Sequence, residues 1–243
     1  MMNKTVIVTG AAKGVGREIA LAFARKGYNV AITTLKSKEQ LLKTKKDIEE
    51  VGVKCLSYIC DGGDFAKVLE TYEDIIQRLG KVDVLVNNGG ISYVGLLTDM
   101  AYEDFDYVIK NNLYSVFNWS KCVTADMVSR KEGKILNVSS VWGEHGASCE
   151  VAYSASKAGI NGFTKALGKE LGPSNVQVNG FALGIIDTEM NDCLDYYEKK
   201  NLETEIPMGR FGTPWEIGEI ICDFAQGKEY ITGQIIGING GFR

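Results

Sequence analysis

Tyr153 and Lys157 stand four residues apart in the alanine-rich stretch Ala152–Ala158, which predicts a helix. Residues four apart lie on one helix face, so the phenol and the ammonium are expected to be neighbours. A free tyrosine titrates near pH ~10, and a nearby cation favours the phenolate and lowers this pKa. The pair therefore predicts proton transfer near neutral pH. The alternative is a surface pair that meets at this spacing by chance.

Ser140 favours the catalytic interpretation. It follows the apolar run Gly133–Ser139, which predicts a buried strand that leads into a loop and then into the Tyr153 helix. Ligands bind at the carboxyl edge of open parallel sheets, so Ser140 is expected to meet a substrate oxygen that Tyr153 also reaches. His145, five residues later, is either a substrate contact or an exposed loop histidine.

Three glycines follow the first predicted strand. The β-branched run Thr5–Thr9 leads into Gly10, Gly14 and Gly16, and a helical pattern covers Arg17–Lys26. Glycines let backbone N–H groups approach a phosphate, and a helix N-terminus adds unpaired donors and partial positive charge. This order predicts a dinucleotide site. The alternative is an ordinary tight turn.

Strand and helix patterns then alternate along the whole chain, which predicts a parallel sheet with helices on both faces. The segment from Leu183 to Met208 is expected to be a mobile loop and helix over the cleft. Further strands are predicted at 29–34, 53–59, 82–86, 133–139, 176–181 and 231–238, and further helices at 37–51, 64–79, 102–130, 152–172 and 214–225.

Polar residues stand at three other informative places. Asp61 follows the third strand, where its carboxylate would bind an adenine amine or cap a turn, whereas Asp64 is the better helix N-cap. Asn87–Gly90, after the fourth strand, is by itself an ordinary turn signal. Asn111 and Asn112 lie inside an amphipathic helix, where Asn is locally unfavourable. Such departures cluster at functional sites.

Composition excludes several classes of protein. The chain has 243 residues, of which 45% are hydrophobic and 24% charged, which suits one large α/β domain. A net charge of −4, without a basic run that interleaves with aromatics, argues against a nucleic-acid partner. No apolar run approaches the roughly 20 residues of a membrane span, so a cytoplasmic protein is expected. Six scattered cysteines and one histidine predict reduced thiols and no metal centre.

The assembled motifs resemble, in order and spacing, those of the short-chain dehydrogenase/reductase family over essentially the whole chain. Pro207–Ile217 and Thr232–Gly241 resemble the C-terminal part of its 3-oxoacyl-[acyl-carrier-protein] reductases. The motifs are Thr9-Gly10-x-x-x-Gly14-x-Gly16, Asn87-Asn-Gly-Gly90, Asn112, Ser140 and Tyr153-x-x-x-Lys157. The resemblance implies a single doubly wound Rossmann-type domain over residues 1–243, with a parallel sheet of about seven strands. Its dinucleotide-binding half would cover about 1–90 and its catalytic half about 91–243.

By this resemblance, Tyr153 protonates a carbonyl oxygen that Ser140 holds. Lys157 lowers the tyrosine pKa and binds the nicotinamide ribose, Asn112 anchors a water that connects the pair to solvent, and Thr188 holds the carboxamide end of the cofactor. The implied catalytic residues are Asn112, Ser140, Tyr153 and Lys157. The implied cofactor-binding residues are Gly10, Lys13, Gly14, Val15, Gly16, Lys36, Asp61, Asn88, Gly89, Tyr153, Lys157 and Thr188.

The resemblance implies reduction of a 3-oxoacyl thioester by hydride from the nicotinamide. One alternative substrate is another alcohol or ketone, such as a hydroxysteroid, and a remote alternative is a nucleotide sensor without catalysis. The intact set of reacting groups argues against the sensor. Two departures are visible, since Gly90 stands where the family usually has Ala and Leu183 where it usually has Pro. The missing proline is expected to loosen the backbone beside the nicotinamide.

The residues at the end of the second strand predict a preference for NADP(H). An NAD site usually places Asp or Glu there to bind the ribose 2′-hydroxyl, whereas this chain has Thr33-Thr-Leu-Lys-Ser37. Lys13 and Lys36 are expected to reach the 2′-phosphate. The alternative is that both are solvated lysines.

The charges near the C-terminal ends of two long helices indicate how strongly an acidic protein partner would bind. Reductases of carrier-bound acyl chains typically present basic residues there, to meet an acidic carrier protein. Here the corresponding regions contain Asp126 and no Arg, although Arg130, Lys131 and Lys169 lie nearby. An acyl carrier protein is therefore expected to dock weakly.

The family resemblance also implies a homotetramer. Apolar residues on the two long helices either support such an assembly or face the core of their own chain. They include Val116, Phe117, Phe163 and Leu167.

Overall fold

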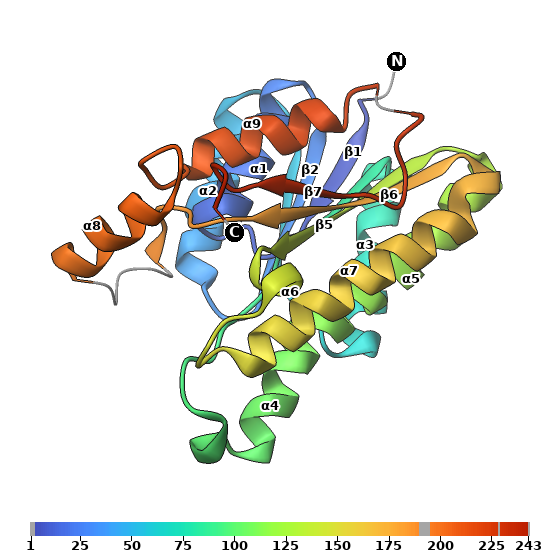
Figure 1. Ribbon diagram of the computed structural model, residues 1–243. Coiled ribbons are helices and arrows are strands. Elements are labelled where there is room, and N and C mark those ends of the chain that lie inside the picture. Colours follow the sequence, from blue (N-terminus) through green and yellow to red (C-terminus); the bar gives the residue numbers. More distant parts are fainter. Residues whose placement is uncertain (1–2, 190–194, 228, 243) are drawn as a thin grey trace.

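The computed structural model describes residues 3–189, 195–227 and 229–242, and its centre is a seven-stranded sheet (Figure 1). The strand order is β3-β2-β1-β4-β5-β6-β7, and every pair of neighbours is parallel. This confirms the predicted single α/β domain with a parallel sheet. The strands are β1 (Thr5–Val8), β2 (Asn29–Thr34), β3 (Cys55–Ile59), β4 (Val84–Asn87), β5 (Gly133–Ser140), β6 (Val176–Leu183) and β7 (Ile235–Ile238).

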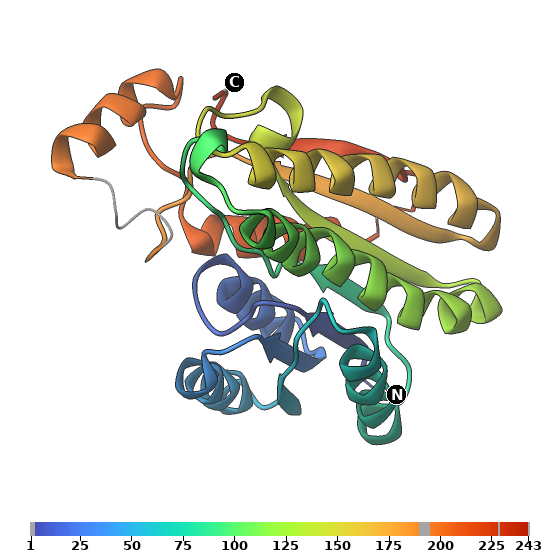
Figure 2. The ribbon, with the colours of Figure 1, turned by 90° about the horizontal axis from the view of Figure 1, so that it is seen from below.

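Helices cover both faces of the sheet, with α1, α2 and α9 on one face and α3, α5 and α7 on the other (Figures 1 and 2). The helices are α1 (Gly14–Arg25), α2 (Lys38–Glu50), α3 (Phe65–Leu79), α4 (Tyr102–Ile109), α5 (Ser115–Arg130), α6 (Trp142–His145), α7 (Val151–Leu171), α8 (Tyr196–Glu205) and α9 (Pro214–Phe224).

Alternation along the strands builds the two apolar layers. In β1, Val6 and Val8 belong to the cluster that contains Phe23 of α1 and Ile221 of α9. Ile7, between them, belongs to the opposite cluster, with residues of α3 and α5. Successive side chains of a strand point to opposite faces, so a continuous apolar strand packs on both helix layers. The sheet therefore holds its carboxyl edge at a fixed place between two cores.

The long helix predicted over 102–130 is divided by a π-helical segment, Lys110–Tyr114, between α4 and α5. Asn112, within this segment, is fully buried, and its amide pairs with both backbone polar groups of Ile91. A π-bulge inserts extra backbone into a helix and is frequent at functional sites. The hydrogen bonds between Asn112 and Ile91 therefore explain why the helix is interrupted at Asn111 and Asn112.

The last strand is shorter than predicted, because β7 begins at Ile235 rather than Ile231. Gly233 has a left-handed φ of +69°, which does not fit an extended strand. Residues 231–234 contact β6 through both backbone and side chains, since the Gly233 N–H donates to the Val178 carbonyl at 2.7 Å and the Gly180 N–H donates to the Gln234 carbonyl at 2.8 Å. Thr232 Oγ1 accepts from the Val178 N–H at 3.1 Å, and Asn179 Oδ1 accepts from the Gln234 N–H at 3.1 Å.

The segment between β6 and α9 contains one described helix, α8, which extends away from the sheet (Figure 1). A capping box between Asp195 and Glu198 starts it, and none of its residues is buried. Leu183 belongs to β6, where its carbonyl accepts from the Val141 N–H at 2.9 Å. The Leu183 carbonyl is therefore hydrogen-bonded to the residue after β5, and the loosening expected from the missing proline stays a prediction. Residues 190–194 of the predicted loop lie outside the described residues.

Candidate active site

The glycine turn between β1 and α1 packs directly on the segment that follows β4. A Cβ built on Gly10 would stand 2.6 Å from Gly89 Cα, and one on Gly16 would stand 2.3 Å from the Gly10 carbonyl oxygen. Thr9 Oγ1 accepts from the N–H groups of Asn88 and Gly89 at 3.0 Å. The Asn88 amide donates to the carbonyls of Thr9 and Gly10 at 3.0 and 3.2 Å. Only glycines allow this close approach of the two backbones.

The N-terminus of α1 is open to an anion. Its N-cap, Lys13, makes no side-chain cap, and its first turn has no acidic residue. Unpaired backbone N–H groups and the helix dipole at such an end favour a phosphate. Thr188 Cγ2 lies 3.5 Å from a Cβ built on Gly14, so Thr188 stands beside this end. Val15 packs against the apolar core and is partly buried.

A cavity of about 360 Å³ connects the glycine turn to the end of β2. Gly89 and Gly90 line it from the β4 side, and Lys36 lines it beyond β2. Glycines that admit no Cβ, an open helix N-terminus and a cavity at the carboxyl edge fit the diphosphate and adenosine parts of a dinucleotide. No carboxylate lines the cavity at the end of β2.

Three charged residues implied as cofactor contacts have partners within the protein. Lys13 forms an ion pair with Glu189. The Lys36 ammonium lies 5.7 Å from the centre of the Tyr107 ring. Asp61 Oδ1 accepts from the Gly63 N–H at 2.9 Å, so this carboxylate caps a turn, and its neighbours Cys60 and Gly62 line the cavity. The first alternative for Asp61, a contact with an adenine amine, is compatible with this hydrogen bond and stays a prediction.

Sequence reasoning missed four cavity residues on the long helical segment. Tyr107 of α4 and Asn111 of the π-helical segment line the cavity, and Ser115 and Trp119 line it from α5. The Asn111-Asn112 pair was the one signal that this helix approaches a site. The aromatic residues carried no signal, since aromatics at helical spacing are usually core.

The side chains of the catalytic constellation gather at the carboxyl end of β5 and the start of α7. Ser140 ends β5, and its hydroxyl is in hydrogen-bonding reach of Tyr153. Lys157 is 4% exposed; its Nζ donates to the Val138 carbonyl at 2.9 Å and lies 5.5 Å from the centre of the Tyr153 ring. The structure thus brings Ser140, Tyr153 and Lys157 together.

Asn112 adjoins this group through Gly90. A Cβ on Gly90 would stand 3.3 Å from Asn112 Oδ1 and 3.5 Å from Lys157 Nζ, so the departure from Ala leaves space between these groups. The Asn112 amide uses both N–H donors within the chain, on the Ile91 carbonyl and on Ser156 Oγ, each at 2.9 Å. Its side chain therefore fixes the loop after β4 and has no N–H left to bind a water.

The pKa values at the site run against the expectation from spacing alone. Burial raises the pKa of Tyr153 to about 12, with the Ser140 hydrogen bond opposing this rise and Glu150 adding to it. Burial lowers the pKa of Lys157 to about 8. Desolvation penalises the charged form of both groups and is the largest cause of each shift. The prediction that Lys157 brings the tyrosine pKa toward neutrality is therefore wrong for the protein without cofactor.

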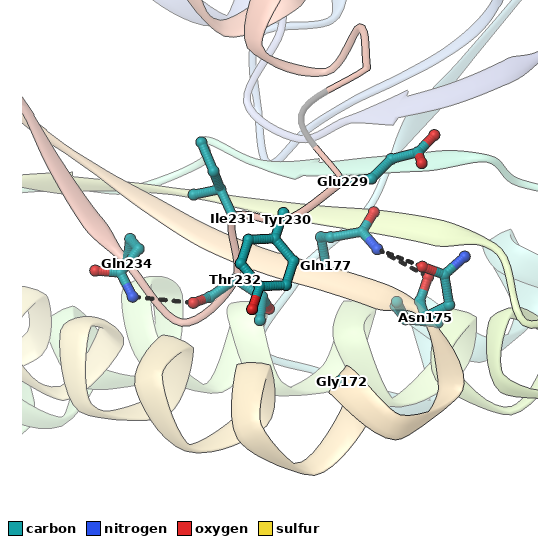
Figure 3. Close-up of a pocket in the computed structure, with 9 residues that line it drawn as sticks. Gly172, Asn175, Gln177, Glu229, Tyr230, Ile231, Thr232 and Gln234 are labelled. Carbon is teal, nitrogen blue, oxygen red and sulfur yellow. Dashed lines mark hydrogen bonds between the residues drawn. The ribbon is translucent and has the colours of Figure 1, made fainter.

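A second cavity, of about 540 Å³, lies near the amino ends of β6 and β7 (Figure 3). Gln177 points into it and donates to the Asn175 carbonyl at 3.0 Å, and Gln234 donates to the Thr232 carbonyl at 3.0 Å. The remaining lining residues are Gly172, Val176, Glu229, Tyr230 and Ile231. Although larger, it contains none of the implied site residues and lies at the opposite edge of the sheet.

Other expectations concern metals, thiols and membranes. Within residues 3–189, 195–227 and 229–242, no group of three or more His, Cys, Asp or Glu is arranged to hold a metal ion. In those ranges, no helix is long and apolar enough to cross a membrane. The described cysteines are free thiols. His145 is exposed on α6 rather than on a loop, and a contact with substrate stays a prediction.

An open parallel sheet with a glycine-lined cavity at its carboxyl edge is the architecture of dinucleotide-binding enzymes. Residues 4–198 match the family described as short chain dehydrogenase. The protein belongs to the short-chain dehydrogenase/reductase family and is thus an NAD(P)-dependent oxidoreductase acting on CH–OH groups.

Relatives match over almost the full chain. The chain is 41% identical to the 3-oxoacyl-[acyl-carrier-protein] reductase FabG of Thermotoga maritima, over 98% of this chain and 97% of the relative. It is 39% identical to the enzyme of the same name from Staphylococcus aureus, over 99% and 98%. It is 36% identical to that of Chlamydia trachomatis, again over 99% and 98%.

Proposed function

We propose that the protein reduces the 3-oxo group of acyl thioesters with NADPH. The observation that carries this proposal is the near full-length similarity to 3-oxoacyl reductases, combined with Ser140, Tyr153 and Lys157 at one end of the sheet. The missing carboxylate at the end of β2 and the presence of Lys36 there support NADPH over NADH.

Each reacting group has a role that its contacts support. When bound, the reduced nicotinamide supplies a hydride to the carbonyl carbon. Tyr153 gives its phenol proton to the carbonyl oxygen. Ser140 Oγ accepts from the Trp142 N–H at 3.1 Å, so its hydroxyl hydrogen, which hydrogen-bonds to Tyr153 in the protein without substrate, can turn to donate to that oxygen. Lys157, still largely protonated below pH 8, stabilises the phenolate that remains.

The cofactor would be held by the turn that joins β1 to α1. Gly10, Gly14 and Gly16 keep this turn open, and the α1 N-terminus binds the diphosphate. Lys36 contacts the 2′-phosphate and Thr188 the carboxamide end. For Lys13 to join Lys36, its ion pair with Glu189 must exchange for the phosphate.

A carrier protein docks weakly in this proposal. Arg130 is committed within its own chain, since its Nε pairs with Asp126 at 2.8 Å and its Nη2 donates to the Val82 carbonyl at 2.6 Å. Lys131 and Lys169 remain exposed. Fewer free basic groups weaken complementarity to an acidic carrier.

One set of kinetic measurements tests cofactor and substrate together. We expect kcat/KM with NADPH to exceed that with NADH, and acetoacetyl-coenzyme A to be reduced nearly as well as acetoacetyl carrier protein. Lys36→Ala should reduce the preference for NADPH.

A preference for NADH would contradict the cofactor proposal. A carrier-linked substrate favoured more than about tenfold, or ~1.4 kcal/mol of transition-state binding, would contradict weak docking. Preference for steroids or simple ketones would contradict the thioester proposal.

We also infer a homotetramer, supported by exposed aromatic residues on α4, the π-helical segment and α5. Phe117 is 47% exposed, and Tyr102, Phe105 and Tyr114 are exposed as well. Large exposed apolar patches mark association surfaces. Of the residues expected at the interface, Val116 is buried and Leu167 packs on the core of its own chain. Light scattering should give four times the chain mass of 26.6 kDa, and a monomer at micromolar concentration would refute the assembly.

A further inference from the structure

Asn161 joins the two helices that lie beside the catalytic group, although it has no part in the reaction proposed above. It lies on α7, one helical turn after Lys157, and is 7% exposed. Its Nδ2 donates to the carbonyl of Gly143 on α6 at 3.1 Å. Gly143 also packs closely on α7, since a Cβ built on it would stand 2.8 Å from the Lys157 carbonyl carbon. The short helix α6 is therefore held against α7 beside a reacting group (Figure 1).

The position of α6 in turn determines the position of the Ser140 oxygen. The sheet fixes the Ser140 backbone, because Ser140 is the last residue of β5 and is paired with Leu183. The side chain is held from α6 instead. Ser140 Oγ accepts from the N–H of Trp142, the first residue of α6, at 3.1 Å. A shift of α6 relative to α7 would therefore move this donor and the Ser140 oxygen with it.

The Tyr153 side of the site is fixed without α6. Lys157 Nζ donates to the Val138 carbonyl at 2.9 Å, and the Ser139 hydroxyl donates to the Lys157 carbonyl at 3.3 Å. Val138 and Ser139 belong to β5, so these contacts attach α7 directly to the sheet. The hydrogen bond from Asn161 to Gly143 thus ties α6 to a helix that already has a fixed position.

Stability alone does not explain an amide at position 161. The Asn161 Oδ1 is buried and has no hydrogen-bond partner among the described residues of the protein. A buried polar atom without a partner is unfavourable, and leucine, whose side chain branches at the same carbon, would avoid it. The feature that asparagine has and leucine lacks is the N–H donor to Gly143.

We propose that Asn161 is a positioning residue: by holding α6 against α7, it keeps the Ser140 oxygen where the hydroxyls of Ser140 and Tyr153 donate to the same carbonyl oxygen. The inference rests on the proposed function, and on the roles of Ser140 and Tyr153 in it. Donors that are in place before the substrate binds stabilise the developing negative charge without reorganisation. Asn161 touches neither substrate nor cofactor in this arrangement and acts through α6.

Asn161→Leu tests the proposal, with acetoacetyl-coenzyme A and NADPH as substrates. We expect kcat to fall about tenfold, since a reacting group misplaced by ~1 Å costs up to ~10²-fold in rate. The KM for NADPH should change by less than about twofold, because its proposed site is the glycine turn and the end of β2. The Tm should stay close to that of the wild type, because removal of the unpaired oxygen offsets the lost hydrogen bond. A purely structural residue would lower Tm and leave kcat nearly intact.

A double-mutant cycle tests whether Asn161 acts through Ser140. In Ser140→Ala no hydroxyl remains to be positioned, so adding Asn161→Leu should lower kcat further by less than about twofold. The same tenfold loss in both backgrounds would overturn the proposal.

Two further variants probe the contact between α6 and α7. Gly143→Ala forces α6 away from the Lys157 backbone, so kcat should fall while the KM for NADPH stays unchanged. Asn179→Leu is the matched control, because Asn179 Nδ2 donates to the carbonyl of Ile231, which lines the second cavity, at 2.8 Å. This control should lower Tm and leave kcat within about twofold of the wild type.

The outcomes separate this inference from the proposed function. A folded Asn161→Leu protein with a near wild-type kcat would overturn the inference while the proposed function stood. If Asn161→Leu did not fold, a near wild-type kcat for Gly143→Ala would overturn it equally. A near wild-type rate for Tyr153→Phe would instead contradict the proposed function.

Discussion

Replacing Tyr153 with Phe is expected to lower kcat for carbonyl reduction by ~10²–10⁴-fold, the usual contribution of a general acid. The change removes one oxygen and no packing surface. With the pKa of Tyr153 raised to about 12, the phenol is protonated across the neutral range and is ready to donate. The measurement is steady-state oxidation of NADPH with an acetoacetyl thioester.

Cofactor binding separates this loss from damage to the fold. In the proposed function, the diphosphate and adenosine parts of the cofactor bind at the glycine turn and the end of β2, so NADPH titrated against protein fluorescence should bind Tyr153→Phe with nearly unchanged affinity. Ser140→Ala should lose rate as well, because it removes the second donor to the carbonyl oxygen. A Phe variant with a near wild-type rate would rule out Tyr153 as the proton donor.

Residue patterns with the short period of a strand or a helix predicted most of the fold and part of the site. The alternation in β1 followed from strand geometry, since Val6 and Ile7 must face opposite layers. The spacing of Tyr153 and Lys157 places both on α7, one turn apart. The order strand, glycine turn and helix located the mouth of the cavity. Each prediction needed only neighbours within a few residues.

Contacts between distant segments were not predictable in this way. The bulge at Lys110–Tyr114 depends on Asn112 meeting Ile91, and the Lys13–Glu189 ion pair joins residues 176 positions apart. A hydrogen bond from Ser92 to Glu150 crosses from the loop after β4 to the start of α7. Sequence patterns carry no record of such pairings, so the positioning residues of the site became visible only in the structure.

The predicted direction of the Tyr153 pKa shift was wrong for the same reason, because burial depends on contacts between distant segments. Spacing alone puts an ammonium near the phenol and predicts a lower tyrosine pKa. Burial is a property of the assembled layers, and it opposes charge on both groups. Lys157 lies against the Val138 carbonyl, under β5 and α7, where water does not reach its ammonium. This buried charge has a consequence for stability as well as for activity.

Lys157→Met is expected to abolish activity and yet stabilise the protein at neutral pH. The pKa of Lys157 is about 8 in the folded protein, against ~10.4 for a free lysine. Between these values the unfolded chain binds more protons, so the stability of the wild type rises with pH over that window. Below pH 8 the buried charge imposes its full cost, about 3 kcal/mol.

Methionine has a similar length and removes this cost. Loss of the hydrogen bond to the Val138 carbonyl lowers the free energy of unfolding by about 1 kcal/mol. The Tm at pH 7 should therefore rise by roughly 2–8 °C. The gain should shrink as the pH rises from about 8 toward 10, where the wild-type lysine is neutral in the fold. Lys165→Met, on an exposed position of the same helix, should leave Tm nearly unchanged. A lower Tm for Lys157→Met at pH 7, or a difference independent of pH, would show that the ammonium is paired well enough to stabilise the fold.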